Sequence, residues 1–393
     1  MGHTGNKSNF DEKLLSSPEK QRNSWLDVLR GLAIFGVVSV HSIQTTDVFI
    51  AQSAISQNFS FLMSLGKYGV ELFFFLSGWL LASIYGLSGN KVGKPYWVRR
   101  MARIYPLWIF FLVIHIMRSL LTKTGGFHSA LNTQEPNFDA FHSFGAIIFF
   151  TLSFTLFISG GLWNTVIPGG WSIQAEVAHY LIFPIMRNRS MASILQILTL
   201  VNLLSGLMAI TRPKLGNFPL FSLQLIDAWL RLSLYSSIGY FVIGAFACLL
   251  YRHVKEGKSS KSQINYEIPW LRAALFLLST LFTPCPFGSQ IEAIGYLAIM
   301  LPISFCVLNI NVLKTLFQNL GRYSYFIYFM HFLVLDAVTL LLNRINFVGT
   351  AIGSQELLFL VIFFVALGTS TLLALPSMKY LERPILKMAH RFK

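Results

Sequence analysis

Charged side chains are scarce in this chain. Only 12% of its 393 residues are Asp, Glu, Lys or Arg, whereas 54% are hydrophobic. A soluble protein carries about 25% charged residues, because its water-facing surface needs them. The sequence also lacks any hydrophilic stretch longer than about 20 residues. These absences exclude a separate soluble domain and indicate an exterior that largely faces lipid.

Cysteine is also rare, and its pattern carries no metal site. The three cysteines, Cys248, Cys285 and Cys306, show no metal-ligand spacing, and neither a disulfide framework nor a bound metal is expected. The formal net charge of +15 would suit a nucleic-acid partner. The basic residues instead gather at the ends of apolar segments, where they orient a membrane protein, so no nucleic-acid partner is expected.

Apolar segments of about 20 residues recur along the chain, and this length spans a bilayer as a helix. The first is followed by no small-residue cleavage site, so we expect a permanent anchor and not a signal peptide. The region 143–187 has two apolar pieces around a Gly/Pro-rich break and is expected to cross the membrane once. The other predicted spans are 27–46, 68–86, 104–121, 191–210, 228–250, 270–284, 290–310, 322–342 and 355–376.

The distribution of Lys and Arg predicts the orientation. With a cytoplasmic N-terminus, this layout places 22 cations inside and 5 outside, which is a strong positive-inside bias. Two crossings in 143–187 would move the basic cluster at 252–261 outside. The sequence therefore predicts an all-α membrane helix bundle of ten spans with both termini in the cytoplasm. It consists of a polar tail at 1–24, a membrane domain at 25–385 and a basic tail at 386–393.

Ionisable residues inside predicted spans are costly and usually functional. Arg30 and His41 are separated by ten residues, which places them on nearly the same face of the first helix, about 16 Å apart along its axis. Glu71 lies near the outer end of the second span, at a depth similar to His41, and could orient the imidazole. The alternatives are a structural, hydrogen-bonded histidine and a glutamate at the water interface.

Two further segments carry polar groups at helical spacing. Arg100 and Arg103 lie one turn apart, and their guanidinium groups suit phosphate, although a cluster next to the membrane can also serve only orientation and headgroup binding. Ser172 is expected to be the N-cap of the helix that follows the glycine-rich break. Glu176 and Tyr180 would then share a face with Ser172.

Six segments in this order resemble the acyltransferase 3 family of membrane O-acyltransferases. They are LDVLRGLAIFGVVSVH, GVELFFFLSGWL, RRMARIYPLW, WSIQAEVAHYLIFP, LGRYSYFIYFMH and LERP, and they cover about residues 25–385. The resemblance implies a ten-helix membrane domain, in a bacterial cytoplasmic membrane, that moves an acyl group from acyl-CoA to an extracytoplasmic carbohydrate or glycolipid. It implies acetyl-CoA as a donor substrate and no permanently bound cofactor.

The resemblance also implies roles for individual residues. His41 corresponds to the family's catalytic histidine, here a general base, and Arg30 to the arginine paired with it. Arg100 and Arg103 match the motif linked to the CoA donor. The remaining candidates are Trp171, Ser172 and Glu176 of the Trp-Ser-x-x-x-Glu element, with Glu176 and Glu71 as catalytic supports, and Tyr325, Tyr328 and His331 as substrate contacts.

The chain departs from the family pattern around Glu176. His179 stands where an aromatic residue is usual, and Gln174 and Ala175 stand where acids often precede the glutamate. The printed sequence ends 9 residues after Pro384. Transfer is therefore expected to finish within the membrane domain or on a separate protein.

Three rival functions share some of these features. A secondary transporter or exporter of a glycan or small molecule also has buried charges and broken helices, but the sequence shows no internal repeat. A glycosyltransferase that uses a lipid-linked sugar would need acids in its outer loops, which are short here. Transfer to a lipid or small molecule remains open, as do the acyl chain, an acyl-histidine intermediate and the oligomeric state.

Overall fold

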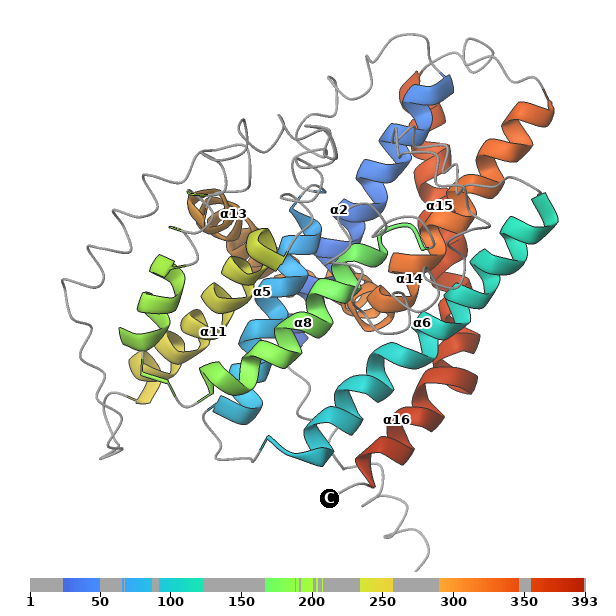
Figure 1. The fold of residues 1–393 in the computed structure, drawn as a ribbon. Helices are drawn as coiled ribbons and strands as arrows, with labels where there is room; N and C mark the ends of the chain where they lie inside the picture. Colours follow the sequence, from blue (N-terminus) through green and yellow to red (C-terminus); the bar gives the residue numbers. More distant parts are fainter. Residues whose placement is uncertain are drawn as a thin grey trace, which may run out of the picture.

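The structure is a computed structural model, and its described part is entirely helical, with no strand (Figure 1). This confirms the predicted all-α class. The predicted pieces at 143–160 and 270–284 lie outside the described residues. The structure describes residues 24–49, 66, 68–86, 92–122, 167–187, 189–190, 192–200, 203, 207, 234–256, 290–345 and 355–391.

The described part of the chain contains eight long helices, three short helical segments and a further helical stretch at 192–200. The long helices are α2 (Ser24–Phe49), α5 (Gly69–Leu81), α6 (Lys94–Thr122), α8 (Gly170–Met186), α11 (Leu234–Glu256), α13 (Gln290–Asn309), α14 (Asn311–Arg344) and α15 (Gln355–Ser377). The short segments are the π-helical turns η2 (Ala82–Gly86) and η6 (Met378–Glu382), and the helix α16 (Arg383–His390).

Among the residues that the structure describes, five helical stretches are long and apolar enough to cross a membrane. They are Ser24–Asp47, Gly69–Gly86, Lys94–Arg118, Asn311–Arg344 and Glu356–His390. Each contains or overlaps one predicted span. The count of ten and the cytoplasmic termini stay predictions, because other predicted spans are shorter helices here or lie partly outside the described residues.

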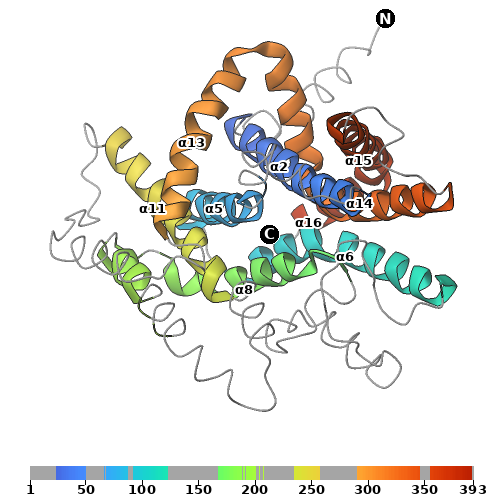
Figure 2. The same cartoon turned by 90° about the horizontal axis from the view of Figure 1, so that it is seen from above.

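Helix α2 lies at the centre of the packing. It contacts α14 most extensively and also packs against α15 and α5, and Figure 2 shows it between these neighbours. Helix α11 packs along α5, and α6 packs against α16. The first and last thirds of the chain are therefore joined through α2 and α14, which carry five of the predicted site residues.

Glycines allow the backbones of α2 and α14 to touch. A Cβ atom at Gly321 of α14 would lie 1.8 Å from the carbonyl oxygen of Asp27, and one at Gly31 of α2 would lie 2.1 Å from that of Phe317. Small residues permit such close approach between membrane helices, where dispersion contacts replace the hydrophobic effect as the main attraction. The register between the two helices is therefore fixed by two reciprocal contacts.

The α5–α11 crossing repeats this arrangement. A Cβ atom at Gly78 would lie 1.9 Å from the carbonyl oxygen of Phe241, and one at Gly244 would lie 2.0 Å from that of Phe75. Two pairs of helices are thus held at backbone contact.

We predict that Gly321→Ala lowers the free energy of unfolding by about 1–3 kcal/mol, because the added methyl group must push α14 away from α2. The midpoint of thermal unfolding in detergent measures this effect. Gly368→Ala in α15 is the matched control, since its Cβ would meet no described atom within 4 Å. Equal midpoints for the two variants would contradict the predicted contact.

Candidate active site

Helix α8 begins at a glycine turn and not at the predicted serine cap. Its N-cap is Gly169, whose φ of 73° is left-handed, and the helix starts at Gly170. Ser172 is the third helical residue, and its Oγ lies 3.0 Å from the Gly169 carbonyl oxygen. The prediction that Ser172 caps the helix is wrong, because the flexible glycine already makes the chain turn one residue before the helix.

The same turn is pressed against α14. The Tyr328 hydroxyl donates to the Gly169 carbonyl at 3.0 Å, and Ser172 Oγ lies 2.9 Å from that hydroxyl. A Cβ atom at Gly169 would lie 2.8 Å from the Tyr328 oxygen and 2.9 Å from the Phe332 ring. The absence of a side chain at Gly169 therefore brings Ser172 and Tyr328 together.

A cavity lies between α2, α5, α6, α8 and α14. Phe73 and Phe74 of α5 form part of its apolar wall. Six predicted site residues also line it: Arg30, Arg103, Ser172, Glu176, Tyr325 and Tyr328.

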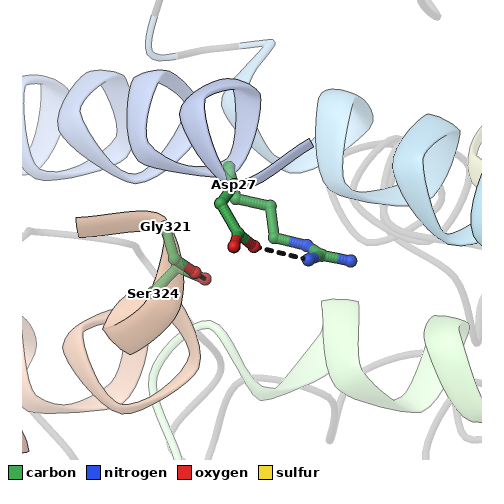
Figure 3. Close-up of polar contacts among 4 residues, drawn as sticks. Asp27, Gly321 and Ser324 are labelled. Atoms are coloured by element: carbon green, nitrogen blue, oxygen red, sulfur yellow. Dashed lines mark hydrogen bonds and ion pairs between the residues drawn. The ribbon is translucent and has the colours of Figure 1, made fainter. Parts of the chain in front are cut away.

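Arg30 is held by a carboxylate that the sequence analysis missed. Its guanidinium lies 3.2 Å from the Asp27 carboxylate on the same helix, and both residues are buried. Figure 3 shows Asp27 on α2 beside Gly321 and Ser324 of α14, with the ion pair dashed. Asp27 and Arg30 are three residues apart, which is a typical spacing for an ion pair on one helix, so the sequence could have indicated this contact.

Arg103 and Glu176 lie within electrostatic range of each other at the cavity wall. The Glu176 carboxylate accepts hydrogen bonds from the Tyr180 hydroxyl and from Ser77 Oγ, the latter at 3.2 Å. Glu382 of the LERP segment also lies within range of Arg103. Glu176 therefore supports the wall around Arg103, and its described hydrogen bonds go to Tyr180 and Ser77.

Arg100 occupies a different environment from Arg103. Its guanidinium carbon lies 5.8, 5.9 and 5.5 Å from the ring centroids of Tyr85, Tyr96 and Tyr180, and the residue is only 8% exposed. Aromatic faces attract a guanidinium, more strongly when water is excluded. The two arginines lie one turn apart as predicted, but only Arg103 lines the cavity.

His41 lies beside His331, with ring centroids 5.4 Å apart. Its Nδ1 is 2.9 Å from Gln44 Oε1, so a residue one turn away on α2 takes the role expected of Glu71 or Glu176. Glu71 instead lies within electrostatic range of Tyr328.

The two histidines do not line the cavity but lie next to its Tyr328 end. The Tyr328 and His331 ring centroids are 6.0 Å apart. Tyr328 therefore separates the cavity from the histidine pair and contacts both.

The remaining two candidates have supporting positions. Trp171 packs edge-on against Phe74 at 6.1 Å between centroids and does not line the cavity. The Tyr325 hydroxyl donates to the Ile104 carbonyl at 3.4 Å while its ring faces the cavity. Tyr325 thereby joins α14 to α6 beside Arg103.

Comparison with known protein families shows to which family this chain belongs. The model of the acyltransferase domain family matches residues 23–378, which is most of the chain. The chain belongs to the acyltransferase 3 family. The resemblance seen in the six sequence segments is confirmed, and the described part of this family member contains several membrane-length helices.

Individual relatives are distant and match only part of this acyltransferase. The peptidoglycan O-acetyltransferase OatA of Listeria monocytogenes is 29% identical over 168 residues, 40% of this chain and 23% of the relative. The acyltransferase MdmB of Streptomyces mycarofaciens is 24% identical over 188 residues, 43% of this chain and 40% of the relative.

A Rhizobium radiobacter protein named for the picA locus is 28% identical over 174 residues, 42% of this chain and 81% of the relative. The matches to OatA and to MdmB cover less than half of either relative, so this chain corresponds to only one part of each. No solved structure gives a significant match.

We predict that neutralising Arg103 and neutralising Arg100 of α6 have different effects, the first on the KM and the second on stability. Arg103→Gln should raise the KM for acetyl-CoA by about 10- to 100-fold, as for loss of a hydrogen bond to a charged group, with a small change in unfolding midpoint. Arg100→Gln should mainly lower that midpoint, because it empties the tyrosine cage. Steady-state kinetics and thermal unfolding of the purified variants measure both effects.

The Lys variants serve as controls, since they keep the charge but not the planar fork. A larger rise in KM for Arg100→Gln than for Arg103→Gln would contradict the assignment of Arg103 to the cavity.

Proposed function

We propose that this acyltransferase moves an acetyl group from cytoplasmic acetyl-CoA to a hydroxyl group of a carbohydrate or glycolipid beyond the membrane. The observation that carries the proposal is the cavity, which has Arg30 and Arg103 in its wall and reaches Tyr328 beside the histidine pair. It offers cations for a phosphate-bearing donor and ends at Tyr328, whose ring lies between the cavity and the histidine pair. An apolar wall between them suits the uncharged arm of CoA.

The dimensions support a donor that enters from the arginine side. Arg30 and His41 are eleven residues apart on one helix, a rise of about 16 Å. Arg30 and Arg103 would bind the CoA phosphates, because guanidinium groups donate two hydrogen bonds at once to phosphate oxygens. The thioester would then lie near Tyr328, within reach of His41.

His41 would act as the general base. Gln44 Oε1 accepts from the Nδ1–H of the neutral ring, which leaves Nε2 as the basic nitrogen. Nε2 removes the proton from the acceptor hydroxyl as its oxygen attacks the thioester carbon. The carbon–sulfur bond breaks, an ester bond forms, and the proton passes to the departing sulfur to give free CoA. A positioned base of this kind contributes about 10²- to 10⁴-fold to the rate.

Ser172 and Tyr328 would stabilise the reacting oxygens. Their hydroxyl groups lie 2.9 Å apart at the cavity wall, and both are held by the Gly169 carbonyl. Each hydroxyl has one proton, and in the resting protein both protons are donated within this cluster. Either hydroxyl would therefore have to turn its proton toward the thioester carbonyl oxygen as negative charge develops there.

The relatives and the amino-acid pattern support a carbohydrate acceptor at the outer face of a bacterial cytoplasmic membrane. The Listeria relative is named for O-acetylation of peptidoglycan. The positive-inside layout would place Arg100 and Arg103 on the cytoplasmic side and His41 in the outer half. Donor and acceptor would then reach the imidazole from opposite compartments.

We predict that His41→Ala abolishes acetyl transfer while the protein still inserts and folds, because the variant lacks the proposed base. Release of CoA and labelling of isolated glycan strands from labelled acetyl-CoA measure the transfer, and the unfolding midpoint checks the fold. His115→Ala, a change to another buried histidine outside the cavity wall, is the control. Wild-type turnover in His41→Ala would show that the base is wrong.

The function as a whole is tested by mass spectrometry of surface polysaccharide from cells with and without the gene. We expect glycan species heavier by one acetyl group only when the wild-type gene is present. Unmodified glycan in both strains, together with gene-dependent movement of a glycan across the membrane, would favour an exporter and reject the acyltransferase proposal.

A further inference from the structure

His331 was expected to be a substrate contact, but its ring lies beside the proposed base and not in the cavity wall. It lies on α14, fully buried, with its ring centroid 5.4 Å from that of His41 on α2 and an angle of 31° between the planes. Phe332 packs against both rings, with centroids 4.1 Å from His331 and 4.6 Å from His41. Because Phe332 also abuts Gly169, the turn before α8 backs the pair.

The hydrogen bonds of both rings define where their protons lie. His41 Nδ1 is 2.9 Å from Gln44 Oε1, and His331 Nδ1 is 2.9 Å from the Ile327 carbonyl oxygen. Both partners are acceptors, so each Nδ1 carries the proton of its neutral ring. Each Nε2 therefore keeps a lone pair.

The His331 Nε2 is buried and has no hydrogen-bond partner within the described part of the chain. A buried acceptor without a donor destabilises the resting protein. A donor that appears only during the reaction would relieve this cost. Protonation of His41 at Nε2 creates such a donor 5.4 Å away between ring centroids.

We propose that His331 is a positioning residue that stabilises the imidazolium formed on His41. The inference rests on the proposed function, in which His41 removes the proton from the acceptor hydroxyl. That proton moves to His41 Nε2, where the lone pair of His331 Nε2 interacts with it directly. It then passes to the CoA sulfur as the carbon–sulfur bond breaks, and His331 gains and loses no proton.

The interaction exists only after proton transfer has begun. It therefore stabilises the transition state more than the bound substrates, and its loss lowers kcat without raising KM. A purely structural His331, needed only for its bond to Ile327, would affect folding instead. The two roles use different nitrogens of the ring and can be separated by two amide substitutions.

The test compares His331→Asn with His331→Gln, using labelled acetyl-CoA and isolated glycan strands. The Asn amide can replace Nδ1 and keep the bond to Ile327, but it cannot reach the position of Nε2. The longer Gln side chain can place an acceptor near Nε2. We expect kcat to fall by about 10- to 100-fold in His331→Asn, with unchanged KM and unfolding midpoint, and to be largely retained in His331→Gln.

Higher kcat in His331→Asn than in His331→Gln, or equal kcat in the two, overturns the proposal. If either variant does not fold, addition of imidazole to His331→Ala decides: recovery of kcat supports the role and no recovery overturns it. His41→Ala separates the two levels of the account. Wild-type turnover in His41→Ala would reject His41 as the base and with it the proposed mechanism. Loss of activity in His41→Ala, together with unchanged kcat in His331→Asn, would reject only the role of His331.

Discussion

The backbone contact between α2 and α14 is the constraint on which the site depends. Gly31 and Gly321 let each helix touch a backbone carbonyl of the other. These two contacts fix the relative position of α2 and α14. Helix α2 carries Arg30 and His41, and α14 carries Tyr325, Tyr328 and His331. A shift of either helix would separate the histidines and move Arg30 away from Tyr328. Gly31 and Gly321, which have no side chain, therefore determine where the proposed catalytic residues of α2 and α14 lie.

Charge compensation is the second requirement, because ions in a bundle core are costly without partners. Arg30 has Asp27, Arg103 has Glu176 and Glu382 within range, and Arg100 has a cage of three tyrosines. This arrangement keeps one guanidinium enclosed and two at the cavity wall. A phosphate ligand can interact with Arg30 and Arg103 without either cation being stranded in the empty site.

Hydrophobic pattern and helical spacing predicted the all-α class, the regions of the five membrane-length helices found in the described part of the chain, and the shared face of Glu176 and Tyr180. They missed Gln44 and the tyrosine cage around Arg100, because these contacts depend on side-chain direction or on helices far apart in sequence. The prediction that Ser172 is the N-cap of α8 was wrong, because Gly169 adopts the left-handed conformation and the helix begins directly after it. Residue spacing alone could not distinguish Arg100 from Arg103, since the neighbours of α6 determine which guanidinium reaches the cavity.

An experimental structure with bound CoA tests the central claim most directly. The account predicts density for the phosphates beside Arg30 and Arg103, and for the sulfur beside Tyr328 within reach of His41. Density for the sulfur on the far side of α2 from the histidines, or for the phosphates away from both arginines, would contradict it.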